Sequence, residues 1–519
     1  MGIHKPTDDR ILIPRWRDFQ KTTNTGELSS LSNPNRNFDF EKKIKQKIDQ
    51  WEKNKNTQDA IYIVNQSITT NTTKLATEPA KYLLKNKKLI SKPLTKLCES
   101  IIEGKESINN NSTVEKISQI NGLIQSKISD IRRSISFNER NPIKWVELSR
   151  WHLVNGHFER AERAMLVAIN LAPTNRYVVR SAVRFFIHKD NRFRTQEEPS
   201  LKKAKKILSE SQRLKNDPWL ISAEIVVSDL LGKTSNFIKK GQDLIRSDNF
   251  SKFDLTELAS TIGTEELKSG SYKNSFHLFA KSLLDPTENA IAQAEWASHH
   301  LTDLEINYAI RNPHEALAKH YKHNDELEKA YEEGLLWCID QPFSSDPAIF
   351  TSDIATDTYP PEKAYTLFDF GLRSNPDNFT LLNNKAYLKA CELHGEDAEI
   401  ILSKIAQDSL DPKEKTIYTA TKGMIAYSKG YFEKGNSLYE NAKDYTKDKK
   451  LKAWVEIYHF QAQKILGLSS NKTEQEEAQE LVKKFSSIIG EKELKKQMKI
   501  LEKRRKGEKL LLKFKSLFK

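Results

Sequence analysis

Residues 142–175 read PIKWVELSRWHLVNGHFERAERAMLVAINLAPTN. In this stretch, large side chains, small side chains and turn formers follow one another in the order that two antiparallel helices require. Ser149 and Ala161 are small enough to let the two helices cross closely, and Gly156 permits the turn between them. Pro173 ends the second helix. The stretch therefore predicts a helix–turn–helix unit.

This unit resembles the tetratricopeptide repeat in both length and spacing. The matching positions are Trp145, Leu148, Ser149, Gly156, Phe158, Ala161, Met165, Ala168, Pro173 and Asn175. One departure is His152, which stands where an aromatic residue is usual, although Trp151 beside it can serve. The resemblance implies a stack of helix pairs and assigns no substrate.

Further copies of the unit follow along the chain. The clearest has small, turn and aromatic residues at the same intervals, namely Gly423, Gly430, Phe432, Gly435, Tyr439 and Ala442. Weaker copies contain Gly263, Gly270, Tyr272, Ser275, Phe279 and Pro286, then Ala330, Gly334 and Trp337, then Ala364, Phe368, Gly371, Pro376 and Asn378. The resemblance covers residues 136–466, and we expect about six to nine repeats there.

The expected fold is all-α, a right-handed α-α superhelix of tetratricopeptide-like repeats. We divide the chain into a partly disordered region with two or three helices (1–130), the solenoid (131–466), and charged helices with a basic tail (467–519). In the first region, helices are expected at residues 40–53 and 79–103, separated by the Asn/Thr-rich residues 65–73. Residues 117–135 are predicted to form a lead-in helix.

Composition agrees with a helical array. Apolar residues make up 37% of the chain and charged residues 30%, which suits amphipathic helices with one solvated face. Eighteen glycines and 17 prolines are few for 519 residues, so we expect almost no sheet. The three cysteines are far apart and suggest neither disulfides nor a zinc site. With no signal-peptide pattern and no membrane span, we expect a cytoplasmic protein, and the excess of Lys and Asn suggests a bacterial source.

Positive charge is concentrated in the last 29 residues. Residues 491–519 contain 12 Lys or Arg and 4 Glu, so they carry +8 of the total +14 and leave +6 for the other 490 residues. The stretch can form a basic amphipathic helix. It is expected either to cap the solenoid or to bind nucleic acid, a protein partner or, least favoured, a membrane surface. For phosphate contact the candidates are Lys503, Arg504, Arg505 and Lys506.

No motif for catalysis or for a cofactor is present. The sequence has no P-loop, GxGxxG, HExxH, GxSxG or EF-hand pattern. Among the histidines, His320 and His323 share a helical face, but no third ligand accompanies them, so no metal site is predicted. We expect neither enzymatic activity nor a cofactor.

The expected function is a protein–protein interaction scaffold or adaptor, because the resemblance implies a concave groove that grips a partner. By alignment of the repeats, seven residues are expected either to face that groove or to be ordinary packing or exposed residues: Arg150, Leu153, Val154, Asn383, Tyr387, Met424 and Tyr427. The apolar and basic cluster around Arg15, Trp16, Arg17 and Phe19 is expected either to pack on its own solenoid or to serve as a docking motif for another protein, because Trp and Arg dominate interface hot spots. The alternative function is a nucleic-acid-associated accessory subunit, acting through the basic tail beside a partner nuclease.

Overall fold

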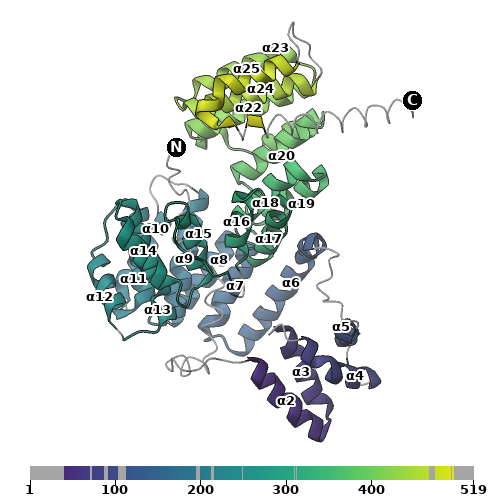
Figure 1. The fold of residues 1–519 in the computed structure, drawn as a ribbon, viewed down its shortest axis with the longest axis vertical. Coiled ribbons are helices and arrows are strands. Elements are labelled where there is room, and N and C mark those ends of the chain that lie inside the picture. Colours follow the sequence, from purple (N-terminus) through teal and green to yellow (C-terminus); the bar gives the residue numbers. More distant parts are fainter. Residues whose placement is uncertain are drawn as a thin grey trace. The chain divides into compact units, whose positions relative to one another are not determined.

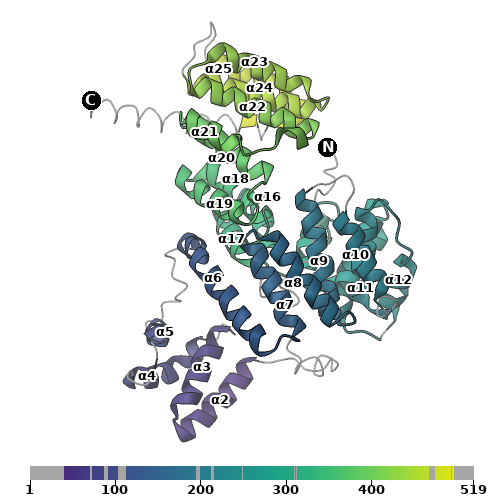
Figure 2. The same ribbon diagram turned by 180° about the vertical axis from the view of Figure 1, so that it is seen from behind.

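The computed structural model describes residues 40–69, 73–86, 90, 92–102, 113–193, 199–211, 216–247, 249–308, 310, 313–466, 474–491 and 494–495. These residues form helices joined by turns and irregular segments, and no β-strand occurs among them. No helix in these ranges is long and apolar enough to cross a membrane. Figures 1 and 2 show the helices from opposite sides. The all-α prediction is confirmed.

The chain divides into two compact units. One lies within Asn24–Lys116, and the other includes the chain from Ile117 onward. The predicted boundary at residue 130 therefore cuts through helix α6 (Thr113–Phe137), which places Ile124, Ile128, Ile131 and Ile135 in the core of the second unit. This helix is the lead-in expected at residues 117–135.

The smaller unit has helices α2 (Phe40–Asn54), α3 (Thr57–Thr69), α4 (Thr77–Lys85) and α5 (Lys92–Ile102), with a short 3₁₀ turn η1 (Thr73–Ala76). Its core contains Trp51, which packs edge-to-face on Tyr82 at 5.5 Å and donates its indole N–H to the carbonyl of Asn56 at 3.1 Å. Most of the separator expected at residues 65–73 is helical, because α3 runs to Thr69.

The larger unit consists mainly of antiparallel helix pairs, which confirms the predicted tetratricopeptide-like repeat fold. The pairs are α7/α8 (Pro142–Val154, Phe158–Leu171), α9/α10 (Arg176–Phe193, Pro199–Glu210), α11/α12 (Pro218–Leu230, Ile238–Arg246), α13/α14 (Lys252–Lys268, Tyr272–Ser282), α16/α17 (His314–His323, Leu327–Asp340), α18/α19 (Asp346–Thr358, Pro361–Ser374), α20/α21 (Phe379–Cys391, Gly395–Leu402), α22/α23 (Pro412–Ser428, Phe432–Asp444) and α24/α25 (Lys449–Ile465, Glu474–Ile489). A further helix, α15 (Glu288–Ser298), precedes α16, and a short 3₁₀ turn η4 (Gln407–Ser409) precedes α22.

The first pair shows how the repeat sequence makes its structure. Asn141 accepts hydrogen bonds from the first backbone N–H groups of α7, and Gly156 takes φ 73° in the turn. The hydroxyl of Ser149 donates to the carbonyl of Ala161 at 2.7 Å, so the two small residues are also bonded across the pair. Ser275 donates to the carbonyl of Gly263 at 2.8 Å in the same way in α13/α14.

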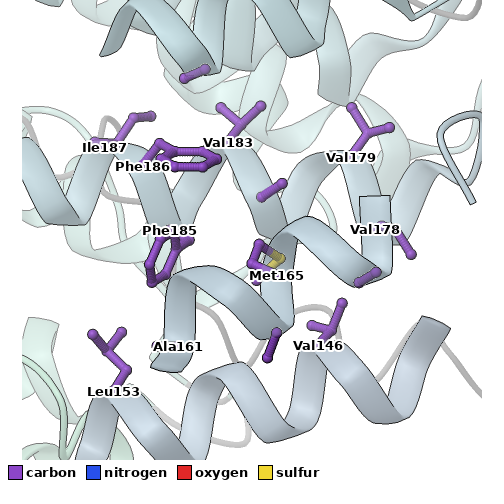
Figure 3. Close-up of a cluster of buried hydrophobic side chains, with 14 of the residues drawn as sticks. Val146, Leu153, Ala161, Met165, Val178, Val179, Val183, Phe185, Phe186 and Ile187 are labelled. Carbon is purple, nitrogen blue, oxygen red and sulfur yellow. The ribbon is translucent and has the colours of Figure 1, made fainter. Parts of the chain in front are cut away.

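The core around this pair is drawn in Figure 3. Ala161 and Met165 of α8 lie between α7, which contributes Val146 and Leu153, and α9, which contributes a run of buried residues from Val178 to Ile187. Helix α9 runs from Arg176 to Phe193, and its partner α10 begins at Pro199.

The pair α7/α8 also contacts helices about 200 residues later in the chain. The hydroxyl of Ser374, at the end of α19, lies 2.7 Å from the carbonyl of Val154 and 2.8 Å from that of Pro342, both of which accept. A Cβ on Gly156 would lie 2.7 Å from the carbonyl oxygen of Arg373. Glycine is therefore required at 156 by this approach as well as by its backbone conformation.

Candidate protein-binding pocket

A pocket of about 360 Å³ is lined by the first helices of four successive pairs, α18, α20, α22 and α24, with Phe368 and Tyr439 contributed by α19 and α23. The first helices of neighbouring pairs pack against each other, so their side chains on one face form a continuous surface. We call this site the α18–α24 pocket.

Aromatic rings form one part of the pocket. Tyr387 of α20 meets Tyr458 of α24 edge-to-face at 5.5 Å, and Tyr458 stacks on Trp454 at 5.9 Å. All three side chains are half-buried, so each ring keeps an accessible surface. Rings of this kind provide large contact areas at low cost in side-chain entropy.

Two carboxylates, Asp353 and Asp357, lie one turn apart on α18 and are the only charged groups among the described lining residues. Asp353 accepts a hydrogen bond from the Lys322 ammonium at 2.6 Å. The Asp353 side chain is 58% exposed, so this ion pair contributes little to stability and leaves the carboxylate accessible.

Two buried polar atoms at the pocket have no hydrogen-bond partner among the described residues. They are Oδ1 of Asn383, a residue that is 3% exposed, and the phenolic oxygen of Tyr439, a residue that is fully buried. Burial also raises the pKa of Tyr439 well above its ordinary value, so the phenol stays protonated and able to donate. One unpaired atom is therefore an acceptor and the other a donor.

Of the seven predicted groove residues, Asn383 and Tyr387 line this pocket. Met424 and Tyr427 do not, because both are fully buried in the core of α22/α23. Tyr427 contacts the side chain of Asn436 with its hydroxyl and lies 2.9 Å from Nε2 of His459. Helix α22 instead contributes Ile417, Ala420 and Thr421, about one turn earlier than expected.

The three predicted groove residues on α7 lie elsewhere. Leu153 and Val154 are buried in the core that α7 shares with Phe343, so the expectation that they face a groove is corrected. Arg150 is half-buried, with its guanidinium 5.8 Å from the ring of Trp151. The hydroxyl of Ser374 on α19 also donates to the carbonyl of Val154, so a later helix contacts the end of α7.

The remaining predicted sites lie outside the described residues. These are the docking motif of Arg15, Trp16, Arg17 and Phe19 and the phosphate-binding set of Lys503, Arg504, Arg505 and Lys506. Among the residues that are described, no group of three or more His, Cys, Asp or Glu side chains is placed to hold a metal ion.

The sequence interpretation missed Trp454 and Tyr458 on α24 and the two aspartates on α18. A signal was available, since each helix places its pocket residues four apart: Asp353 and Asp357, Asn383 and Tyr387, Trp454 and Tyr458. Residues at i and i+4 share a helical face.

No family model and no curated protein matches the sequence. Among solved structures, the chain is similar to yeast Tom70, with 11% identity, a TM-score of 0.30, and coverage of 88% of this chain and 97% of that one. It is also similar to Naa15/Naa10 bound to HypK-THB, with 12% identity, a TM-score of 0.23, and coverage of 86% and 87%. At these scores, neither likeness bears on function.

Proposed function

We propose that this chain is a protein-interaction scaffold that binds an extended or helical segment of a partner protein in the α18–α24 pocket. The observation that carries the proposal is the group of half-buried rings on two first helices of the array, Tyr387 on α20 and Trp454 and Tyr458 on α24. Accessible aromatic side chains on a rigid helical surface are typical of interface anchors.

The unpaired polar atoms favour a peptide as the bound group. A buried acceptor or donor without a partner costs about 1–3 kcal/mol, which a ligand recovers by bonding to it. A peptide offers N–H groups for Oδ1 of Asn383 and carbonyls for the hydroxyl of Tyr439. Nucleic acid fits this pocket less well, because the described lining has no Lys, Arg or His to contact phosphates.

We propose a binding role rather than a catalytic one. The described lining contains no Ser, Cys, Lys or His, which are the common nucleophiles and bases of enzymes. Its two carboxylates belong to Asp353, which is exposed, and Asp357, which is half-buried.

The test compares two aromatic-to-alanine variants of the full chain in affinity capture followed by mass spectrometry. Tyr387→Ala removes a pocket ring, whereas Tyr272→Ala removes a ring that is 55% exposed on α14. We expect Tyr387→Ala to lower the affinity for the partner about 30-fold, as the loss of a hot-spot residue does. The free energy of unfolding should fall by only about 1 kcal/mol.

Tyr272→Ala should retain the same partner, because its ring lies outside the pocket. The proposal is refuted if the two variants capture the same proteins in the same amounts. It is also refuted if Tyr387→Ala acts chiefly by melting the protein, which circular dichroism would show.

A further inference from the structure

The composition of the pocket indicates a preference for positively charged ligands. This inference rests on the proposed function and goes one step beyond it. Its described charged groups are the carboxylates of Asp353 and Asp357, and its half-buried aromatic rings lie on two helices, α20 and α24. Carboxylates and aromatic faces both attract Lys and Arg side chains. The chemistry that fits is therefore a segment in which basic residues alternate with large apolar ones.

One segment of this chain has that chemistry. Residues 496–519 contain ten Lys or Arg, two Glu and nine large apolar residues, Met498, Ile500, Leu501, Leu510, Leu511, Leu512, Phe514, Leu517 and Phe518. The segment lies outside the described residues. Its composition alone shows that it is complementary to a pocket that combines acidic and aromatic groups.

The described chain leads up to this segment beside the pocket. Leu494 is fully buried against Ala453 and Ile457 of α24 and against Phe485 of α25. The next positions on α24, Trp454 and Tyr458, line the pocket. Leu494 therefore lies on the face of α24 next to the face that lines the pocket. A tether this short gives an effective concentration on the order of millimolar.

We propose that residues 496–519 bind in the α18–α24 pocket of their own chain, and that a partner segment of similar basic and apolar character must displace them. Competition from the tail then raises the concentration of partner that is needed for binding. Neutralising its charge opens the pocket without altering any residue that lines it.

The first experiment places a photo-crosslinker in the pocket of the full chain. Tyr458→p-benzoylphenylalanine is irradiated at low concentration and its crosslinks are mapped by mass spectrometry, with Tyr272→p-benzoylphenylalanine as the control. We expect crosslinks to residues 496–519 from position 458 and none from position 272. The proposal is overturned if position 458 crosslinks to other segments and not to residues 496–519. Mixing isotope-labelled and unlabelled protein shows whether the crosslinks form within one chain or between chains. Crosslinks that form only between chains assign the tail in the pocket to a second copy and also overturn the proposal.

The second experiment measures binding of a fluorescein-labelled peptide with the sequence of residues 496–519. The full chain is compared with a variant that carries the four changes Lys503→Gln, Arg504→Gln, Arg505→Gln and Lys506→Gln. We expect the variant to bind the probe at least about tenfold more tightly, because its own tail no longer competes at high effective concentration. Adding Asp353→Asn and Asp357→Asn to the variant should abolish that gain.

The outcomes separate this inference from the proposed function. Equal affinity of the unaltered chain and the tail variant shows that the tail does not occupy the pocket, which overturns the inference while leaving the pocket a binding site. Absence of probe binding to both proteins overturns the preference for basic segments. The proposed function is decided independently, by capture of the partner with Tyr387→Ala and Tyr272→Ala.

Discussion

The first repeat contains a titratable group that links stability to pH. His152 of α7 is 3% exposed, and its Nδ1 has no hydrogen-bond partner among the described residues. Burial lowers its pKa to about 4, with smaller contributions from the positive charges of Arg132, His157, Arg160 and Arg163. The folded chain therefore holds this imidazole neutral at pH values where an unfolded chain protonates it.

The sign and size of the effect follow from linkage. The pKa of His152 is lower in the folded state, so its neutral form favours folding at neutral pH, and this contribution is lost as the pH falls from about 6.5 towards 4. Between pH 7.5 and pH 5, the unfolded state gains a proton that the folded state does not bind. The expected loss in the free energy of unfolding is about 2 kcal/mol.

The assay is urea unfolding at pH 7.5 and pH 5, followed by tryptophan fluorescence. His152→Phe removes the titrating group and restores the aromatic residue that the repeat pattern favours at this position. We expect acidification to cost this variant about 2 kcal/mol less than it costs the unaltered chain. His277→Phe, which replaces an exposed histidine of α14, should leave the acid sensitivity unchanged. Equal acid sensitivity of His152→Phe and the unaltered chain would refute the reasoning.

Three further substitutions test the packing. Gly423→Ala places a methyl group 2.8 Å from the ring of Tyr439, so we expect a loss of about 1–3 kcal/mol in thermal or urea unfolding. Ser374→Ala removes a hydrogen bond to the carbonyl of Val154; hydrogen exchange at the end of α7 should accelerate, with a cost of about 1–3 kcal/mol. Glu257→Gln leaves two buried arginines without their carboxylate, and calorimetry should show a loss of about 3–5 kcal/mol.

Local features of the repeats could be predicted because they depend on residues close in sequence. The close crossing at Ser149 and Ala161 requires small side chains at fixed spacing, and the sequence displays both. Gly423 and Gly435 follow the same rule. A Cβ on Gly423 would lie 2.8 Å from a ring carbon of Tyr439, and a Cβ on Gly435 would lie 2.8 Å from a ring carbon of Tyr427. Helix pairs of this kind need no information from distant parts of the chain.

Groove residues were harder to predict, because burial on the first helix of a pair depends on what else packs there. Val154 was expected in a groove, but it is buried in a core that includes Phe343, and Ser374, about 200 residues later, donates to its carbonyl. On α22 the predicted register was about one turn late, and Tyr427 serves as a core residue. A single sequence shows the period of the apolar residues on a helix. It does not show which face of that helix packs against residues far away in the same chain.

Arrays of this kind can use the first helices of their pairs in two ways. In α9, α13 and α15, polar side chains meet one another: Glu257 is buried with Arg180 and Arg184, and Asn289 donates to it at 3.2 Å. Although burial raises the pKa of Glu257, the two arginines lower it overall, so the carboxylate stays charged and paired. Glu257 therefore contacts two arginines and an amide in the interior of the array.

The α18–α24 pocket differs because half-buried aromatic rings line it. Oδ1 of Asn383 and the hydroxyl of Tyr439 are buried without partners among the described residues, and half-buried rings surround them. Unsatisfied groups in a core lower stability and bring no structural benefit, whereas in a pocket they gain energy when a ligand binds. This contrast within one array is the reason to seek the partner at α18–α24 and to expect mutations at Glu257 to affect folding first.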